Sequence, residues 1–106
     1  MKNLSALVLI IGLAFVAKAA QVPVLLDTDM DSDCDDAGAL AILHTLADRG
    51  EAEILTTMVS SRQRWPAPCV AAINAWHGRP DLSIGTPRSA AKDWDRRESK
   101  YARIIS

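Results

Sequence analysis

Six carboxylates crowd into one ten-residue segment of this chain. Residues 27–36 read DTDMDSDCDD and hold six of the thirteen acidic residues. Two carboxylates about 5 Å apart repel each other by roughly 3 kcal/mol at an effective dielectric near 20. A fold that gathers these side chains therefore needs a bound cation, raised pKa values, or side chains that splay into solvent. A bound hard metal ion is the simplest of the three.

The acidic segment directly follows the apolar run Val22–Leu26. A leucine-rich, β-branched run that ends in carboxylates is typical of a buried parallel strand, with its acids at the edge where open α/β sheets bind ligands. We expect strands at 22–26, 53–59 and 82–85, and helices from about 36 to 49 and from 66 to 76, with a further helix starting near 101. Prolines at the start of the second helix, and Gly50 and Gly78 after the two helices, support these bounds.

Alternating strands and helices predict a Rossmann-like α/β parallel sheet with right-handed crossovers. A parallel sheet is normally covered by helices on both faces, and two helices are few for that purpose. The pattern is therefore typical of the N-terminal part of a larger domain.

The first residues have the features of an export signal. Lys2 supplies a positive start, Leu4–Ala17 is apolar, and Ala17-Lys18-Ala19 fits a cleavage site. The apolar run is shorter than the roughly 20 residues that span a bilayer, so we expect no stable membrane span, although an uncleaved anchor remains the alternative. The prediction is a signal peptide over 1–19 and a secreted or periplasmic domain over 20–106.

Charge bears on the possible binding partners, and cysteine content bears on a possible disulfide. The net charge is -1, and the basic residues near the C-terminus alternate with acids, so we expect no nucleic-acid partner. Cys34 and Cys69 could form a disulfide in an exported chain, and the sequence leaves their pairing open.

Two other known acidic motifs could account for the aspartates of this segment. An EF-hand loop needs Gly at its sixth position and Glu at its twelfth, and registers starting at Asp27 or Asp29 have neither. Haloacid-dehalogenase-like phosphohydrolases share the pattern Asp27-Thr28-Asp29. However, Asp31 stands where they have Thr or Val, and the pair Asp35-Asp36 would have no role.

Leu25–Asp29, followed by Asp35–Ala41 at a helix start, resembles the inosine/uridine-preferring nucleoside hydrolase family. That family opens with a strand, an Asp-x-Asp and an Asp-Asp-Ala leading into an apolar helix. Its second strand is similar to Ile54–Val59, so the resemblance extends from about Val22 to Gly85.

The resemblance implies a role for four aspartates. Asp29 would ligate Ca²⁺ and deprotonate the attacking water, and Asp36 would also ligate the ion. Asp35 would bind ribose hydroxyls, and Asp27 would support the cluster. The implied reaction is hydrolysis of the N-glycosidic bond of a small-molecule nucleoside or related N-riboside by calcium-activated water.

The chain departs from the family in three ways. Five residues rather than three separate Asp29 from Asp35, which leaves Asp31 and Asp33 without a role. Ser60-Ser61-Arg62 follows the second strand where the family often has Asn, so another N-riboside or glycoside is an alternative substrate. Family enzymes are also much longer, and supply a further calcium-binding Asp and an acid-side His from their C-terminal half.

The 106-residue chain is thus expected to be an incomplete enzyme. The alternative is a non-catalytic calcium- or ligand-binding remnant, and a homo-oligomer of a full-length form is left open. Among the remaining residues, we expect Trp65 near the site, Trp76 in the core, and His44 and His77 in structural roles.

Overall fold

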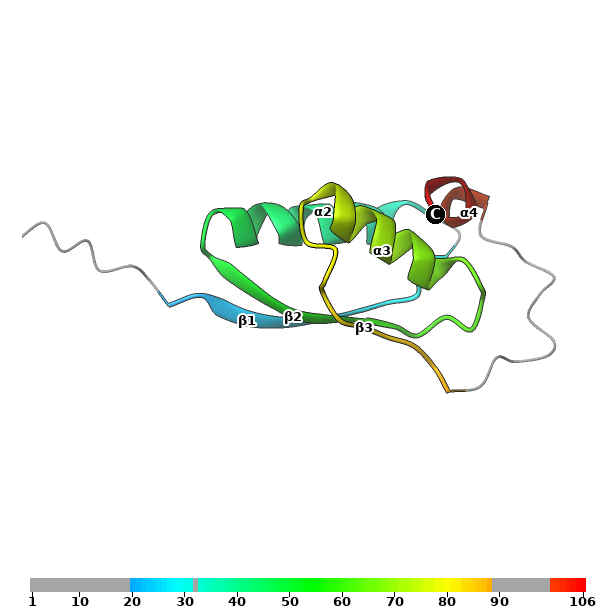
Figure 1. Ribbon diagram of the computed structural model, residues 1–106, viewed down its shortest axis with the longest axis horizontal. Helices are drawn as coiled ribbons and strands as arrows, with labels where there is room; N and C mark the ends of the chain where they lie inside the picture. The colour runs from blue at the N-terminus through cyan, green and yellow to red at the C-terminus, as the bar shows by residue number, and fades with distance from the viewer. Residues whose placement is uncertain (1–19, 32, 89–99) are drawn as a thin grey trace, which may run out of the picture.

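A computed structural model describes residues 20–31, 33–88 and 100–106 (Figure 1). The predicted signal peptide lies outside these residues. The strands are β1 Val22–Thr28, β2 Ala52–Val59 and β3 Ile84–Gly85, and the helices are α2 Asp35–Asp48, α3 Pro66–Trp76 and α4 Lys100–Ile105. No helix in the described part of the chain is long and apolar enough to cross a membrane.

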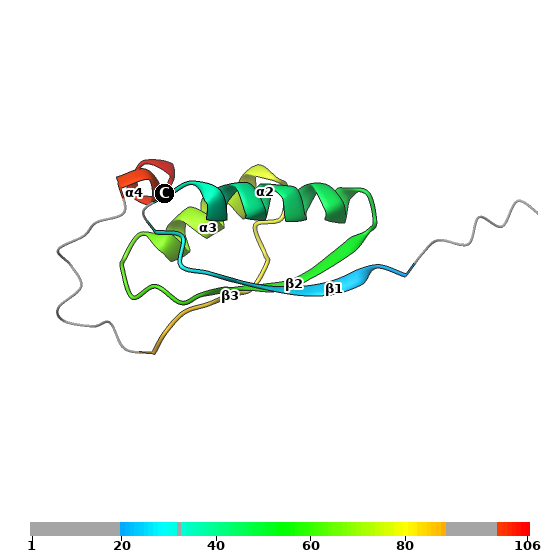
Figure 2. The same cartoon turned by 180° about the vertical axis from the view of Figure 1, so that it is seen from behind.

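The three strands form one parallel sheet in the order β1-β2-β3. The order never reverses, so crossovers of one hand carry both connecting helices to the same side. Figures 1 and 2 show α2 and α3 together on one face of the sheet. The prediction of an α/β parallel sheet with flanking helices is confirmed.

The predicted elements match the structure closely, apart from two strand ends. Strand β1 continues two residues beyond the predicted end, because Asp27 and Thr28 pair with Met58 and Val59 of β2. Strand β3 is shorter than predicted and contains only Ile84 and Gly85. The end of β1 therefore lies directly before Asp29, which places that residue at the edge of the sheet.

The core lies between the sheet and the helices. Its larger cluster is built around Met30, Leu40, Val59, Cys69, Val70 and Ala102. A smaller cluster, Leu43, Ala52 and Ile54, fills the other end of the α2 interface. Cys34 is exposed, Cys69 is buried, and neither is disulfide-bonded.

The opposite face of the sheet is bare within the described residues. Leu25 is 66% exposed, and Leu55 and Met58 are about half exposed. Met58 lies across Gly85, where a Cβ atom would come within 2.8 Å of the methionine sulfur. The expectation that Trp76 belongs to the core is wrong: its side chain is 88% exposed at the last residue of α3, outside both core clusters.

His44 joins α2 to α3 through a buried polar cluster. Its Nε2 lies 2.9 Å from Asn74 Oδ1, and its Nδ1 lies 3.3 Å from Arg79 Nη1. Arginine can only donate, so Nδ1 accepts and Nε2 carries the proton. The ring stacks on His77 with centroids 4.5 Å apart, and Arg79 also pairs with Asp48. This arrangement holds His44 in its neutral form, in the structural role that was expected.

This cluster predicts acid-sensitive stability. Burial lowers the pKa of His44 below its usual 6.5. As pH drops below about 6.5, the unfolded chain therefore binds more protons than the folded one, and the free energy of unfolding falls. The slope is at most about 1.4 kcal/mol per pH unit, and the fall ends once the pH is below the pKa of His44 in the folded state. Urea unfolding between pH 7.5 and pH 5 should show this loss in the wild type and less of it in His44→Gln.

His77→Gln is the matched control, because His77 stacks on the cluster but is only partly buried. It should keep most of the acid dependence of the wild type, because burial of His44 is the largest cause of its lowered pKa and the charge of His77 is a smaller one. Identical pH profiles for the wild type and His44→Gln would contradict the neutral assignment of His44.

Candidate active site

The ends of β1 and β2 bring two loops side by side. Thr28 is in register with Val59, so Asp29 and Ser60 leave the sheet at the same edge. The Ser60 backbone N–H donates to the Thr28 carbonyl at 2.9 Å, and the Ser60 hydroxyl donates to the same oxygen at 3.3 Å. These bonds fix the start of one loop against the other, at the edge where parallel sheets bind ligands.

Met30 turns the chain immediately after Asp29. Its φ of 46° lies in the left-handed region, which is uncommon for a residue with a side chain. Its side chain is fully buried in the core, and its N–H lies 3.0 Å from both Thr28 Oγ1 and Asp36 Oδ2. The buried side chain and these two acceptors stabilise a strained turn, which ties the start of α2 to the end of β1.

Asp29 and Asp36 meet at this turn. A hydrogen bond with the Asp36 carboxyl raises the pKa of the exposed Asp29, and some loss of hydration and the negative charges of Asp36 and Asp31 raise it further. A backbone hydrogen bond at Asp31 acts weakly in the opposite direction. Asp36 lies in the first turn of α2, where the helix dipole favours its negative charge. Two carboxylates this close favour either a shared proton or a cation.

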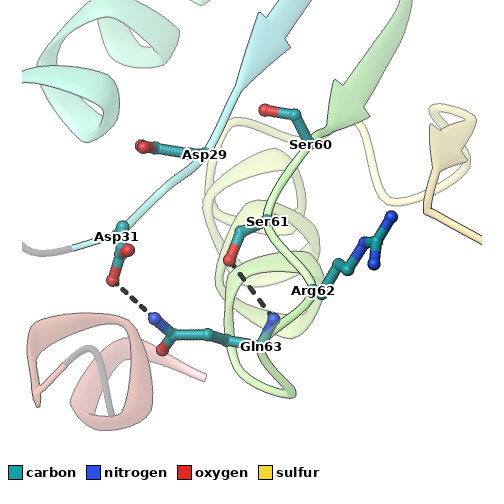
Figure 3. Close-up of a pocket in the computed structure, with 6 residues that line it drawn as sticks. All are labelled: Asp29, Asp31, Ser60, Ser61, Arg62 and Gln63. Atoms are coloured by element: carbon teal, nitrogen blue, oxygen red, sulfur yellow. Dashed lines mark hydrogen bonds between the residues drawn. The ribbon is translucent and has the colours of Figure 1, made fainter. Parts of the chain in front are cut away.

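A pocket of about 410 Å³ opens beside Asp29 (Figure 3). Its lining residues come from the two loops: Asp29, Asp31, Ser60, Ser61, Arg62 and Gln63. Gln63 Nε2 donates to Asp31 Oδ1 at 2.9 Å, and the Gln63 N–H donates to Ser61 Oγ at 3.2 Å. The volume is in the usual range for small-molecule sites.

The structure brings together two of the four aspartates predicted from the family resemblance, Asp29 and Asp36. Asp35 is exposed at the start of α2, with no hydrogen bond to that pair. Asp27 is exposed on β1 in register with exposed Met58, and the adjacent Thr28 is buried. Because side chains alternate along a strand, Asp27 lies on the bare face of the sheet, away from α2. Among the described residues, no contact of Asp27 supports the role that was predicted for it.

Sequence reasoning missed how the loop after β2 contributes. Ser60-Ser61-Arg62 had been connected only with substrate preference, yet residues 60–63 supply four of the six lining residues of the pocket. The sequence did contain a signal for this contribution, because these residues directly follow the strand that lies next to β1. Trp65, expected near the site, instead packs against the core as the residue before α3, and its indole N–H is buried without a hydrogen-bond partner in the described structure.

The donor chemistry at this edge fits a hard cation only in part. Asp29 and Asp36 offer the carboxylate oxygens that Ca²⁺ prefers, but Ca²⁺ takes six to eight oxygen ligands. Over residues 20–31, 33–88 and 100–106, no group of three or more His, Cys, Asp or Glu side chains is arranged to hold a metal. The pair could therefore hold one side of an ion, with the remaining ligands from other oxygens.

Comparison of the chain with protein-family models, with curated proteins and with solved structures gave no match. A function can therefore be inferred only from the residues of the acidic segment and from the geometry around Asp29.

Proposed function

We propose that this chain carries part of a nucleoside hydrolase fold, and that its site serves hydrolysis of the N-glycosidic bond of ribonucleosides or related N-ribosides. One observation carries the proposal: Asp29 from a strand end and Asp36 from a helix start meet beside a pocket of about 410 Å³. The motif that predicted both residues belongs to that family. The bare sheet face agrees with a fold that adds a further layer, since parallel sheets are covered on both faces.

In this mechanism Asp29 accepts the proton of the attacking water. Without a metal, the neighbouring Asp36 and Asp31 raise the pKa of Asp29, whereas a bound cation would lower it and keep the carboxylate ionised to accept the proton. Asp36 anchors the turn through the Met30 N–H and adds negative charge for a cation. Bound Ca²⁺ would lower the pKa of the water. The acids of the pocket would also favour the positive charge that develops on the sugar in an oxocarbenium-like transition state.

We also propose that the protein is exported and that it binds a small molecule. Residues 1–19 have the features of a signal peptide, so the mature domain would act in a secreted or periplasmic setting. A non-catalytic calcium- or ligand-binding protein is the second candidate. It is favoured by the finding that, of the four aspartates predicted from the resemblance, only Asp29 and Asp36 meet in the described structure.

Release of free base from ribonucleosides in the presence of Ca²⁺, followed by chromatography, tests the proposal. Calcium-dependent release supports the hydrolase. Binding of Ca²⁺ or nucleoside without release supports the binding protein. Release of phosphate from a phosphomonoester in place of base would instead support a haloacid-dehalogenase-like phosphohydrolase.

Metal binding gives a separate prediction. Because the candidate ligands are hard oxygens, calorimetry should show tighter binding of Ca²⁺ than of Zn²⁺. Asp36→Asn keeps an oxygen for the Met30 N–H but removes the charge, and it should weaken Ca²⁺ binding by about tenfold or more.

Asp33→Asn is the matched control, because it removes the same charge from an exposed residue that does not line the pocket. It should leave calcium affinity nearly unchanged. Equal losses in the two variants would show that diffuse negative charge, rather than the Asp29–Asp36 pair, attracts the ion.

A further inference from the structure

A second pocket adjoins the candidate active site. It has a volume of about 210 Å³, and it shares Ser61, Arg62 and Gln63 with the first pocket. Its charge is reversed, because Arg62 and Arg64 line it and none of the described residues that line it is acidic. The loop after β2 thus separates an acidic pocket from a basic one.

Within the described residues, no carboxylate pairs with either guanidinium group. Figure 3 shows the Arg62 side chain extending away from Asp29 and Asp31. In the described part of the chain neither Arg62 nor Arg64 forms an ion pair, and the salt bridge found there joins Arg79 to Asp48. The guanidinium carbon of Arg64 lies 4.5 Å from the centroid of the Trp65 ring, a cation–π contact that restrains the arginine side chain.

The start of α3 adds to the positive character of this pocket. Pro66 and Pro68 have no N–H, so Ala67, which lines the pocket, supplies an amide of the first turn. No acidic side chain occurs in that turn to offset the positive end of the helix dipole.

Hydroxyl groups provide neutral donors on the same wall. Ser61 Oγ already accepts the Gln63 N–H at 3.2 Å, which leaves the hydroxyl proton of Ser61 to donate elsewhere. Thr86, directly after β3, also lines the pocket and carries a second hydroxyl group. Paired guanidiniums with neutral N–H and O–H donors are the chemistry that binds carboxylates and phosphates.

We propose that the second pocket binds an oxyanion group, a carboxylate or a phosphate, on a ligand whose sugar occupies the first pocket. The anion site follows from the arginines alone, whereas the identity of the sugar rests on the proposed function. The substrate class is therefore an N-riboside that carries an anionic substituent. The acidic pocket selects the sugar and the basic pocket selects the anion.

Inorganic phosphate is the first probe, because it requires no hydrolysis and no calcium. Calorimetric titration of the full chain at low ionic strength should show saturable binding of one phosphate that weakens as salt is added. Arg62→Gln and Arg64→Gln should each weaken it by about tenfold or more, as expected for loss of a charge-assisted hydrogen bond. Arg62→Lys, which keeps the charge but loses the planar fork, should fall between the wild type and Arg62→Gln.

Arg49→Gln is the matched control. Arg49 follows α2 at the opposite edge of the sheet and lines neither pocket, so the variant loses the same charge far from the site. Circular dichroism should show that all variants fold. Absence of saturable phosphate binding, or an equal loss in Arg49→Gln, would overturn the anion site.

Three ligands then identify the source of the anion: a neutral ribonucleoside, its 5′-monophosphate, and a ribonucleoside with a carboxylate on its base. At least one anionic ligand should bind more tightly than the neutral one and lose that advantage in Arg62→Gln. If neither anionic ligand has an advantage, the substrate class is wrong. If phosphate binds but no nucleoside binds or is hydrolysed, the anion site stands and the proposed function fails.

Discussion

Replacing Asp29 with asparagine should lower kcat for ribonucleoside hydrolysis by at least about 10²-fold, the low end for loss of a general base. Asparagine keeps the shape of the side chain but cannot accept the proton of the attacking water. It also removes one of the two charges that meet at the end of β1. The measurement is kcat from initial rates at saturating nucleoside and calcium, on a form of the protein that hydrolyses nucleosides.

Two further variants separate catalysis from charge and from binding. Asp33→Asn removes the same charge from an exposed position outside the pocket, and kcat should stay within about twofold because exposed charges are screened. Asp35→Ala should mainly raise KM, as expected if its carboxylate binds ribose hydroxyls. An Asp29→Asn variant that retains its kcat would rule out Asp29 as the base.

The largest expected loss of stability comes from Met30→Ala. Truncation of a fully buried methionine costs about 2–5 kcal/mol, from lost apolar contact and the cavity left behind. Alanine keeps the cost of the left-handed backbone at this position, so the loss is not offset by relief of strain. The free energy of unfolding from urea titration measures the effect.

Met58→Ala is the matched control, because it truncates the same side chain on the bare face of the sheet, where it is 48% exposed. It should change the free energy of unfolding by about 0.5 kcal/mol or less, as surface substitutions usually do. Met30→Ala should also weaken calcium binding, since the Met30 turn holds Asp29 beside Asp36. Equal destabilisation by the two variants would show that Met30 is not a core anchor.

The helices and the sheet were predictable because their signals are local. The apolar runs before Asp27 and around Ile54 have strand character, and Pro66 and Gly50 mark a helix start and a helix end. Parallel pairing of β1 with β2 then follows from a strand-helix-strand order. The meeting of Asp29 with Asp36 was also predictable, because one residue ends a strand and the other begins the next helix along the chain.

The exact ends of the strands were less predictable, and they decided the position of Asp27. Pairing with Met58 extends β1 past the apolar run, and the alternation of side chains then directs Asp27 to the face opposite α2. Trp76 was misjudged for a similar reason. Its apolar helix indicated a core position, but α3 ends at this residue, and neither core cluster of the described structure includes its side chain.

Local patterns of residues predict the helices and strands of this protein, their order, and the segment where carboxylates gather. The completion of the site depends on packing between distant parts of the chain. Gln63 contacts Asp31 across 32 residues, and His44 contacts Asn74 across 30. Such contacts depend on how the helices and loops pack over the sheet, and local patterns of residues do not encode that packing. The same packing sets the Met30 turn and separates an acidic pocket at Asp29 from a basic one at Arg62 and Arg64.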